Sequence, residues 1–258
     1  MALIKKFRIK SYKEKQTLLQ LDKISMFYNR RQILNNLNLK INKHEVLGML
    51  GPNGVGKSTI FHIITGLKDP SFGRVLINGE ECTNIPIYER ATRYKLGYVP
   101  QYGGFIQNLN LLENLKLVGE IHIKEKEIRK LKLEKIISQF EFDPLLKIKA
   151  KYLSGGQKKK LVIAMALVND PNILLLDEPF AALDILTIKM LQEIIVNLQA
   201  LEKITVIVCD HQARDLLSCV DRAIVLSNGK IIASGSPNEI IKDASAKSAY
   251  FGDEFKIN

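Results

Sequence analysis

The spacing of hydrophobic residues predicts that strands and helices alternate along most of the chain. Segments 17–28 and 32–41 alternate between apolar and polar positions, which is typical of half-buried strands. Residues 45–50, "EVLGML", form an apolar run that indicates a fully buried strand. Similar runs predict further short strands at residues 74–79, 96–100, 172–179 and 205–210.

Helical spacing appears between these strands. From 111 to 140 apolar residues recur at helical intervals, and a second helix is expected at 154–169, where Ser154 is a natural N-cap. Other helices are expected after the glycine-rich segment as far as about Leu67, at 184–199 and from Gln212. The pattern as a whole predicts an α/β fold with a mainly parallel core sheet. The helical stretch at about 105–165 reads as an inserted subdomain.

Asn228-Gly229 lies between two alternating segments within residues 221–235. This dipeptide favours a two-residue hairpin turn. An antiparallel hairpin is therefore expected near the C-terminal end of the sheet.

Composition restricts the class of protein. With 258 residues, 46% of them hydrophobic, the chain is long enough for one large domain or two small ones. Its longest unbroken apolar run, 161–168, is far shorter than a membrane span, and no secretory signal is expected at the start. The three cysteines have spacings that fit neither a disulfide framework nor a metal site, which favours a reducing cytoplasm.

The formal charge of +11 is unevenly distributed. Residues 1–15 hold six lysines and arginines against one glutamate, so residues 1–16 are expected to form a basic extension, either a disordered solvated tail or a contact with anionic lipid. The chain lacks the basic patches interleaved with aromatic residues that single-strand binders use. No nucleic-acid partner is expected.

A phosphate site is indicated by residues 51–59, "GPNGVGKST". This segment follows a predicted strand, opens a predicted helix and matches the P-loop pattern. The glycines allow backbone N–H groups to surround a phosphate, Lys57 reaches the β- and γ-phosphates, and Ser58 is a ligand for Mg²⁺. The expected nucleotide-binding residues of the loop are Gly51, Pro52, Asn53, Gly54, Val55, Gly56, Lys57, Ser58 and Thr59.

Two carboxylates, Asp177 and Glu178, end the apolar strand "ILLLDE". They are expected at the carboxyl edge of the sheet beside the P-loop, where Asp177 would hold Mg²⁺ through water and Glu178 would polarise an attacking water. His211 follows another strand and is expected at the same edge, where a histidine is more often structural than catalytic.

Four motifs in this order resemble the ATP-binding cassette (ABC) family of ATPases over residues 17–240. They are "GPNGVGKST", Gln101 after "LGYVP", "LSGGQ" at 153–157, and "LLLDEP" followed by His211. The resemblance implies the ABC ATPase fold, with an antiparallel β subdomain beside the parallel core, for an ABC ATPase domain at 17–243 and a C-terminal tail at 244–258. It also implies ATP hydrolysis with Mg²⁺ by a head-to-tail homodimer that drives transmembrane permease subunits.

The resemblance also implies a role for each matching residue. Tyr28 matches the aromatic residue that stacks on adenine, Gln101 the residue that senses Mg²⁺, Glu178 the catalytic glutamate, and His211 the histidine that contacts the γ-phosphate. Contacts to ATP across the dimer are implied for Ser154, Gly155, Gly156, Gln157 and Asp184. The sequence departs from the usual family pattern at Ile185, where a proline is common, and at Lys158–Lys160, where at least one arginine is usual.

Lys158, Lys159 and Lys160 lie in the first turn of the predicted helix, where the helix dipole disfavours cations. In a nucleotide-bound dimer this helix start faces a triphosphate. We therefore expect the lysines to contribute to the field around ATP, although some of them would remain on the solvent side.

Within the family, "GYVPQ", "LLLDEPFAALD", "CDHQARDLL" and "YFGDEF" at 250–255 are similar to members that power lipopolysaccharide extraction from the bacterial inner membrane. This similarity implies a peripheral position on the cytoplasmic face of that membrane and a lipopolysaccharide export pair as permease partner. Phe105 and Ile106 are expected as an exposed apolar pair that docks the partner.

Two alternatives remain open. One is the ATPase subunit of a branched-chain amino-acid importer. The other is a soluble ABC ATPase that acts in iron–sulfur cluster assembly, translation or DNA repair. In the DNA-repair class a long coiled coil separates the P-loop from the "LSGGQ" motif, whereas Lys57 and Ser154 of this chain are 97 residues apart. The translation class carries two cassettes per chain, whereas this chain has one.

Overall fold

The computed structural model describes residues 16–252. The basic extension predicted for residues 1–16 lies outside this part except for its last residue, and so do residues 253–255 of the C-terminal motif. Six strands form the main sheet in the order β10-β9-β3-β8-β7-β6, and every neighbouring pair is parallel except β9 and β10. The strands are β3 (Val46–Leu50), β6 (Leu96–Val99), β7 (Ile173–Asp177), β8 (Thr205–Cys209), β9 (Arg222–Ser227) and β10 (Lys230–Gly235).

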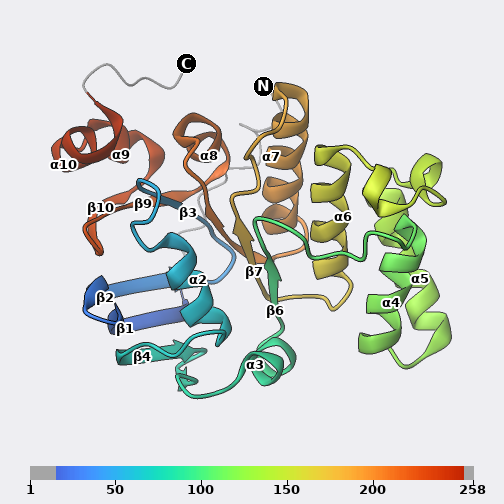
Figure 1. Ribbon diagram of the computed structural model, residues 1–258, viewed down its shortest axis with the longest axis horizontal. Helices are drawn as coiled ribbons and strands as arrows, with labels where there is room; N and C mark the ends of the chain where they lie inside the picture. Colours follow the sequence, from blue (N-terminus) through green and yellow to red (C-terminus); the bar gives the residue numbers. More distant parts are fainter. Residues whose placement is uncertain (1–15, 253–258) are drawn as a thin grey trace.

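A second sheet is antiparallel throughout, in the order β2-β1-β4-β5. It contains β1 (Thr17–Tyr28), β2 (Arg31–Asn42), β4 (Phe72–Ile77) and β5 (Glu80–Glu81). The two sheets confirm the predicted α/β fold with a mainly parallel core and an antiparallel β subdomain (Figure 1).

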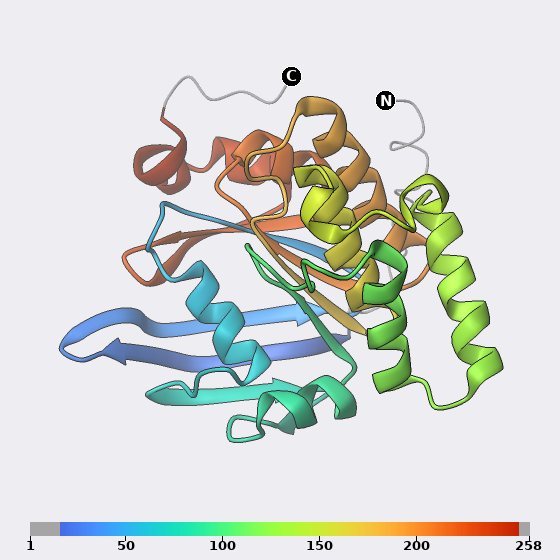
Figure 2. The same cartoon turned by 45° about the vertical axis from the view of Figure 1, so that its right-hand side comes forward.

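The helices surround the main sheet, and the predicted helical region lies beyond one of its edges (Figures 1 and 2). Residues 111–140 form two helices, because Ile123 adopts an extended conformation and ends the first of them. No helix within residues 16–252 combines the length and apolar character needed to cross a membrane. The α-helices are α2 (Lys57–Thr65), α3 (Ile87–Arg93), α4 (Leu111–His122), α5 (Lys126–Gln139), α6 (Gly155–Leu167), α7 (Ile185–Ala200), α8 (Ala213–Cys219), α9 (Pro237–Lys242) and α10 (Ala244–Ala246), with short helices η1 (Asp143–Leu145), η2 (Ala150–Tyr152) and η3 (Lys247–Phe251).

The main sheet separates two hydrophobic cores. Successive residues of β7 alternate between them, so that Leu174 and Leu176 belong to one core and Ile173 and Leu175 to the other. This alternation follows from the period of two in a strand. The first core includes residues of α4 to α8, and the second includes α2 and the antiparallel sheet. Both faces of the sheet are therefore buried, as its continuous apolar strands predict.

The C-terminal hairpin has the predicted turn. Asn228 and Gly229 both have positive φ, +48° and +71°, as a two-residue type I′ turn requires. After the hairpin, η3 returns to the sheet edge, where Tyr250 and Phe251 pack against the first core. The Tyr250 hydroxyl donates a hydrogen bond of 2.7 Å to the backbone carbonyl of His211, and burial raises the pKa of Tyr250 to about 12.

Parallel strands bring their carboxyl ends to the same edge of a sheet. The segments that follow β3, β6, β7 and β8 accordingly converge there: the glycine-rich loop, Gln101, the pair 177–178 and His211.

Arg90 of α3 is fully buried and fixes the far end of α2. Its guanidinium donates hydrogen bonds of 2.6–2.9 Å to four backbone carbonyls, those of Ile63, Ile64, Thr83 and Ile85. We expect Arg90→Ala to destabilise the fold by about 4 kcal/mol or more, because four buried carbonyls lose their donor and each one left unpaired costs about 1–3 kcal/mol. The melting temperature should fall by at least about 8 °C. Arg93→Ala, which removes an exposed ion pair with Glu80, is the control, and an equal fall in both variants would contradict this reading.

Candidate functional site

The glycine-rich loop joins β3 to α2, and its shape depends on glycine. Gly51 and Gly56 have φ of +150° and +114°. A Cβ at Gly51 would lie 2.6 Å from the carbonyl oxygen of Leu226, and one at Gly56 would lie 2.7 Å from Leu34. The Lys57 ammonium donates to the carbonyl oxygens of Gly51 at 2.7 Å and Pro52 at 3.1 Å. The lysine therefore lies over the concave side of the loop, with its charge where phosphate oxygens would bind.

Ser58 follows Lys57 in α2 and lies against the end of β7. Its hydroxyl is 3.3 Å from Oδ1 of Asp177, and the Asp177 side chain is almost fully buried. These two oxygen atoms come from segments that are 119 residues apart. Hydroxyl and carboxylate oxygens are the ligands that Mg²⁺ prefers.

Glu178 lies beside Asp177 and is held from two sides. Nε2 of Gln101 donates to Oε2 of Glu178 at 2.6 Å, and Nδ1 of His211 lies 3.4 Å from the same oxygen. Glu178 has a positive φ of +45°, and its backbone N–H donates to the carbonyl of Cys209 at 2.8 Å. Since positive φ is uncommon for glutamate, the neighbouring strand holds the backbone in a conformation that directs this side chain to the edge.

Asp210, which sequence reasoning did not single out, organises the same edge. Its carboxylate accepts from the backbone N–H groups of Phe180 at 3.0 Å and Gln212 at 2.9 Å. Burial raises the pKa of Asp210. The residue joins the segment after Glu178 to the segment that carries His211. Its position immediately before His211 at a strand end was the available signal.

The start of α6 has the predicted cap. The Ser154 hydroxyl accepts from the backbone N–H of Gln157 at 3.2 Å, and the Gln157 side chain accepts from the backbone N–H of Ser154 at 2.9 Å. This reciprocal capping box satisfies two N–H groups at the helix end. Within one chain the Gln157 side-chain oxygen is therefore used to cap its own helix.

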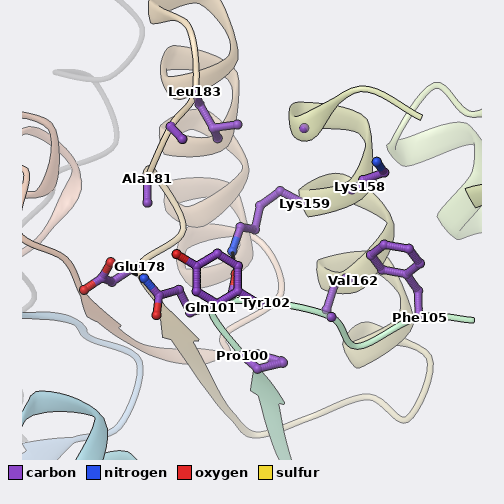
Figure 3. Close-up of a pocket in the computed structure, with 13 residues that line it drawn as sticks. Pro100, Gln101, Tyr102, Phe105, Lys158, Lys159, Val162, Glu178, Ala181 and Leu183 are labelled. Carbon is purple, nitrogen blue, oxygen red and sulfur yellow. Dashed lines mark hydrogen bonds between the residues drawn. The ribbon is translucent and has the colours of Figure 1, made fainter. Parts of the chain in front are cut away.

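The three lysines of α6 differ in their surroundings. Lys159 points from α6 toward Gln101, whereas Lys158 points away from it (Figure 3). The Lys159 ammonium donates to the carbonyl of Gln101 at 3.2 Å, and burial lowers its pKa. The Lys160 ammonium lies 5.6 Å from the ring centroid of Phe142. Two of the three cations are thus engaged within their own subunit.

A cavity of about 260 Å³ lies between α6, the segment after β6 and the loop after β7 (Figure 3). Glu178 and Gln101 lie at one end of it and Phe105 at the other. The cavity connects the sheet edge to the segment that was predicted to dock a partner.

That segment is anchored by Asn114, a fully buried residue of α4. The Asn114 amide accepts from the N–H of Ile106 at 2.7 Å and donates to its carbonyl at 3.1 Å. Ile106 is exposed over 47% of its surface, as expected. The expectation of an exposed pair is wrong for Phe105, which is half-buried because it packs against the core that contains α6.

Asp184 caps the N-terminus of α7. Its carboxylate accepts from the backbone N–H of Thr187 at 3.0 Å and from the Thr187 hydroxyl at 2.5 Å, and these hydrogen bonds lower its pKa. The next two residues, Ile185 and Leu186, are exposed. Tyr28 is also exposed, at the tip of the β1–β2 hairpin, and Leu34 of β2 lies directly against Gly56.

The structure therefore brings Lys57, Ser58, Gln101, Asp177, Glu178 and His211 to one edge of the sheet. Ser154 and its neighbours start α6, which lies apart from α2 in both ribbon views (Figures 1 and 2). The ABC transporter family model matches residues 34–181.

The chain belongs to the ABC transporter family. An ABC transporter ATP-binding protein of Rhizobium meliloti is 36% identical, over 89% of this chain and 84% of that protein. The lipopolysaccharide export system ATP-binding protein LptB of Haemophilus influenzae is 34% identical, over 93% of this chain and 100% of LptB. A solved ATP-binding cassette, the dimeric MJ0796 bound to ADP and phosphate, is 29% identical and superposes with a TM-score of 0.76, over 85% of this chain and 99% of that one.

Gly156 of this ABC family member is packed so tightly that it provides a test of the α6–α7 contact. A Cβ there would lie 2.5 Å from Cγ2 of Thr187. Alanine is favoured over glycine in helices by about 1 kcal/mol, yet we expect Gly156→Ala to destabilise the protein by about 1–3 kcal/mol, because the clash is the larger effect. Thr187→Ser removes Cγ2 and keeps the hydroxyl that bonds Asp184, so it should recover most of the loss.

Thermal unfolding of both single variants and the double variant measures this coupling. Gly155→Ala is the matched control, since the nearest atom to its added Cβ is 3.6 Å away. A gain in stability for Gly156→Ala would contradict the account.

Proposed function

We propose that this ABC transporter ATPase subunit hydrolyses ATP with Glu178 as the residue that activates water, and that its transport system exports lipopolysaccharide. The observation that carries the first part is the position of Glu178. Its carboxylate is bonded to Gln101 and lies next to His211, at the edge that also holds the P-loop. Phosphoryl transfer to water depends mainly on positioning and charge stabilisation, and this edge supplies both.

The phosphate-binding residues act first in the proposed cycle. Lys57 and the N–H groups of the loop hold the β- and γ-phosphates, and both Lys57 and Ser58 lie in the first turn of α2, whose N-terminal dipole favours the anion. Tyr28, exposed on the hairpin beside the loop, is proposed to stack on adenine.

The residues present fit Mg²⁺. Ser58 and Asp177 place two oxygen ligands 3.3 Å apart, and Gln101 lies at the same edge. Among residues 16–252 there is no cluster of three or more histidine, cysteine, aspartate or glutamate side chains suited to a metal, which suits an ion that takes its remaining ligands from phosphates and water. When bound, the ion would neutralise charge on the β- and γ-phosphates. Asp177 and Ser58 would hold the ion, and Glu178 would remain available as the base.

The second half of the ATP site is proposed to come from another copy of the chain. Ser154, Gly155, Gly156 and Gln157 begin a helix that offers a hydroxyl and N–H groups to an anion, and this helix lies apart from α2 within one subunit (Figure 1). The related cassette MJ0796 is dimeric with ADP and phosphate. Asp184 and the exposed Ile185 and Leu186 would lie at the same dimer interface.

The proposed transport substrate is assigned from the similarity to LptB. The match to LptB of Haemophilus influenzae covers the full length of LptB and 93% of this chain. This match supports lipopolysaccharide export, a peripheral position on the inner membrane and a pair of export permease subunits as partners. Phe105, at the end of the cavity that reaches Glu178, and the adjacent exposed Ile106 are proposed to transmit the partner's movement. An amino-acid importer subunit is the alternative, since cassettes not named for lipopolysaccharide are as similar.

Glu178→Gln tests the catalytic proposal. The amide keeps the size of the side chain and cannot take a proton, so ATP binding should persist while hydrolysis falls at least 100-fold and a dimer accumulates with bound ATP. Phosphate release, nucleotide fluorescence and light scattering measure these quantities. Glu134→Gln, on an exposed part of α5, should leave all three unchanged. Hydrolysis at the wild-type rate in Glu178→Gln would end the proposal.

Affinity purification from native membranes, followed by mass spectrometry, tests the transport proposal. Tagged wild-type protein should retain lipopolysaccharide-export permease subunits. Ile106→Asp should lose them, because a charge replaces an exposed apolar contact, while Ile128→Asp, with 53% exposure on α5, should not. Recovery of amino-acid permeases would assign the chain to an importer. Recovery of the tagged protein in the fraction that is free of membranes would assign it to the soluble ABC ATPases.

A further inference from the structure

The carboxylate of Asp177 accepts hydrogen bonds from residues of both neighbouring strands. Oδ1 lies 2.8 Å from the Cys209 thiol, which donates to it, and Oδ2 accepts from the Tyr98 hydroxyl at 3.3 Å. Each oxygen of the carboxylate thus has a donor of its own besides Ser58. Neither donor belongs to the motifs from which the site was predicted.

The sheet register explains why these two residues meet Asp177. β7 lies between β6 and β8; Asp177 is directly paired with Cys209 of β8, while Tyr98 of β6 is paired with Leu175. Leu175 lies two residues before Asp177 in β7, so Tyr98 faces the same side of the sheet as Asp177. The donors come from opposite sides of the strand that carries the carboxylate.

Neither donor is free to move. Cys209 has no exposed surface. The Tyr98 ring is packed edge to face by Phe61, with centroids 6.2 Å apart, and by His62 at 6.4 Å. Both of these residues belong to α2, the helix that carries Ser58. The hydroxyl of Tyr98 is thus positioned by the same helix that presents the other proposed metal ligand.

We propose that Cys209 and Tyr98 are positioning residues that fix the orientation of the Asp177 carboxylate for Mg²⁺. This rests on the proposed role of Asp177 as a metal ligand. An aspartate carboxylate can turn about two side-chain bonds and so has several orientations, and a donor on each oxygen selects one of them. Outer groups of this kind typically change metal affinity or activity by 10–100-fold when they are removed.

Cys209→Ala, Tyr98→Phe and the double variant test the proposal by metal binding rather than turnover. The affinity of a fluorescent ADP is measured with Mn²⁺ and again in EDTA. We expect the enhancement by Mn²⁺ to fall about 10-fold in each single variant, with the affinity in EDTA unchanged. Cys209→Ser, which restores a donor in the same position, should recover most of the enhancement.

Two matched controls exist in the chain. Cys82→Ala removes another buried thiol, and Tyr94→Phe removes another largely buried hydroxyl, which lies 3.4 Å from Glu80. Both controls should behave as wild type, and melting temperatures without nucleotide report folding in every variant. Equal losses in the controls, or unchanged Mn²⁺ enhancement in Cys209→Ala and Tyr98→Phe, would overturn the positioning role.

Asp177→Asn separates this proposal from the one on which it rests. If Asp177→Asn loses the Mn²⁺ enhancement while Cys209→Ala and Tyr98→Phe keep it, Asp177 is a metal ligand and the positioning role alone is wrong. If Asp177→Asn keeps the enhancement, the metal role of Asp177 itself is wrong.

Discussion

The parallel register of β3, β8, β7 and β6 is the constraint on which the rest of the site depends. Because the four strands run in one direction, they end at one edge, and the segments after Leu50, Val99, Asp177 and Cys209 begin there. Residues from distant parts of the sequence meet there without any long side chain having to reach. The two cores on either side of the sheet hold this register, since a slip of one residue would exchange the side chains that each core receives.

The parts of this arrangement that depend on a short stretch of sequence could be predicted from the sequence. The P-loop, the acidic end of β7 and the N-cap at Ser154 depend on neighbouring residues, so they were visible in the chain itself. Contacts made between strands were not visible. Tyr98 and Cys209 reach Asp177 only through strand register, and no short motif marks them. The proposed chemistry of the site was therefore predictable, whereas its supporting contacts were not.

Exposure was the other property that local pattern could not supply. Phe105 follows a loop and looks like part of an exposed pair, but tertiary packing against the core half-buries it. The lysines of α6 were expected to contribute to the field around ATP, with some of them on the solvent side, and local pattern did not reveal that the Lys159 ammonium donates to the carbonyl of Gln101. That contact joins the start of α6 to the edge of the sheet. It gives the helical region and the sheet edge that holds Glu178 a direct connection within one chain.

The central claim is that one chain holds the phosphates and Glu178, while a second copy supplies the start of α6. Light scattering of a variant that combines Ser154→Arg with Glu178→Gln, in the presence of ATP, tests it most directly. The large cation should block the interface but leave the P-loop intact. The account predicts a nucleotide-bound monomer with a mass near 29.2 kDa. A dimer that persists, or a monomer that no longer binds ATP, would contradict it.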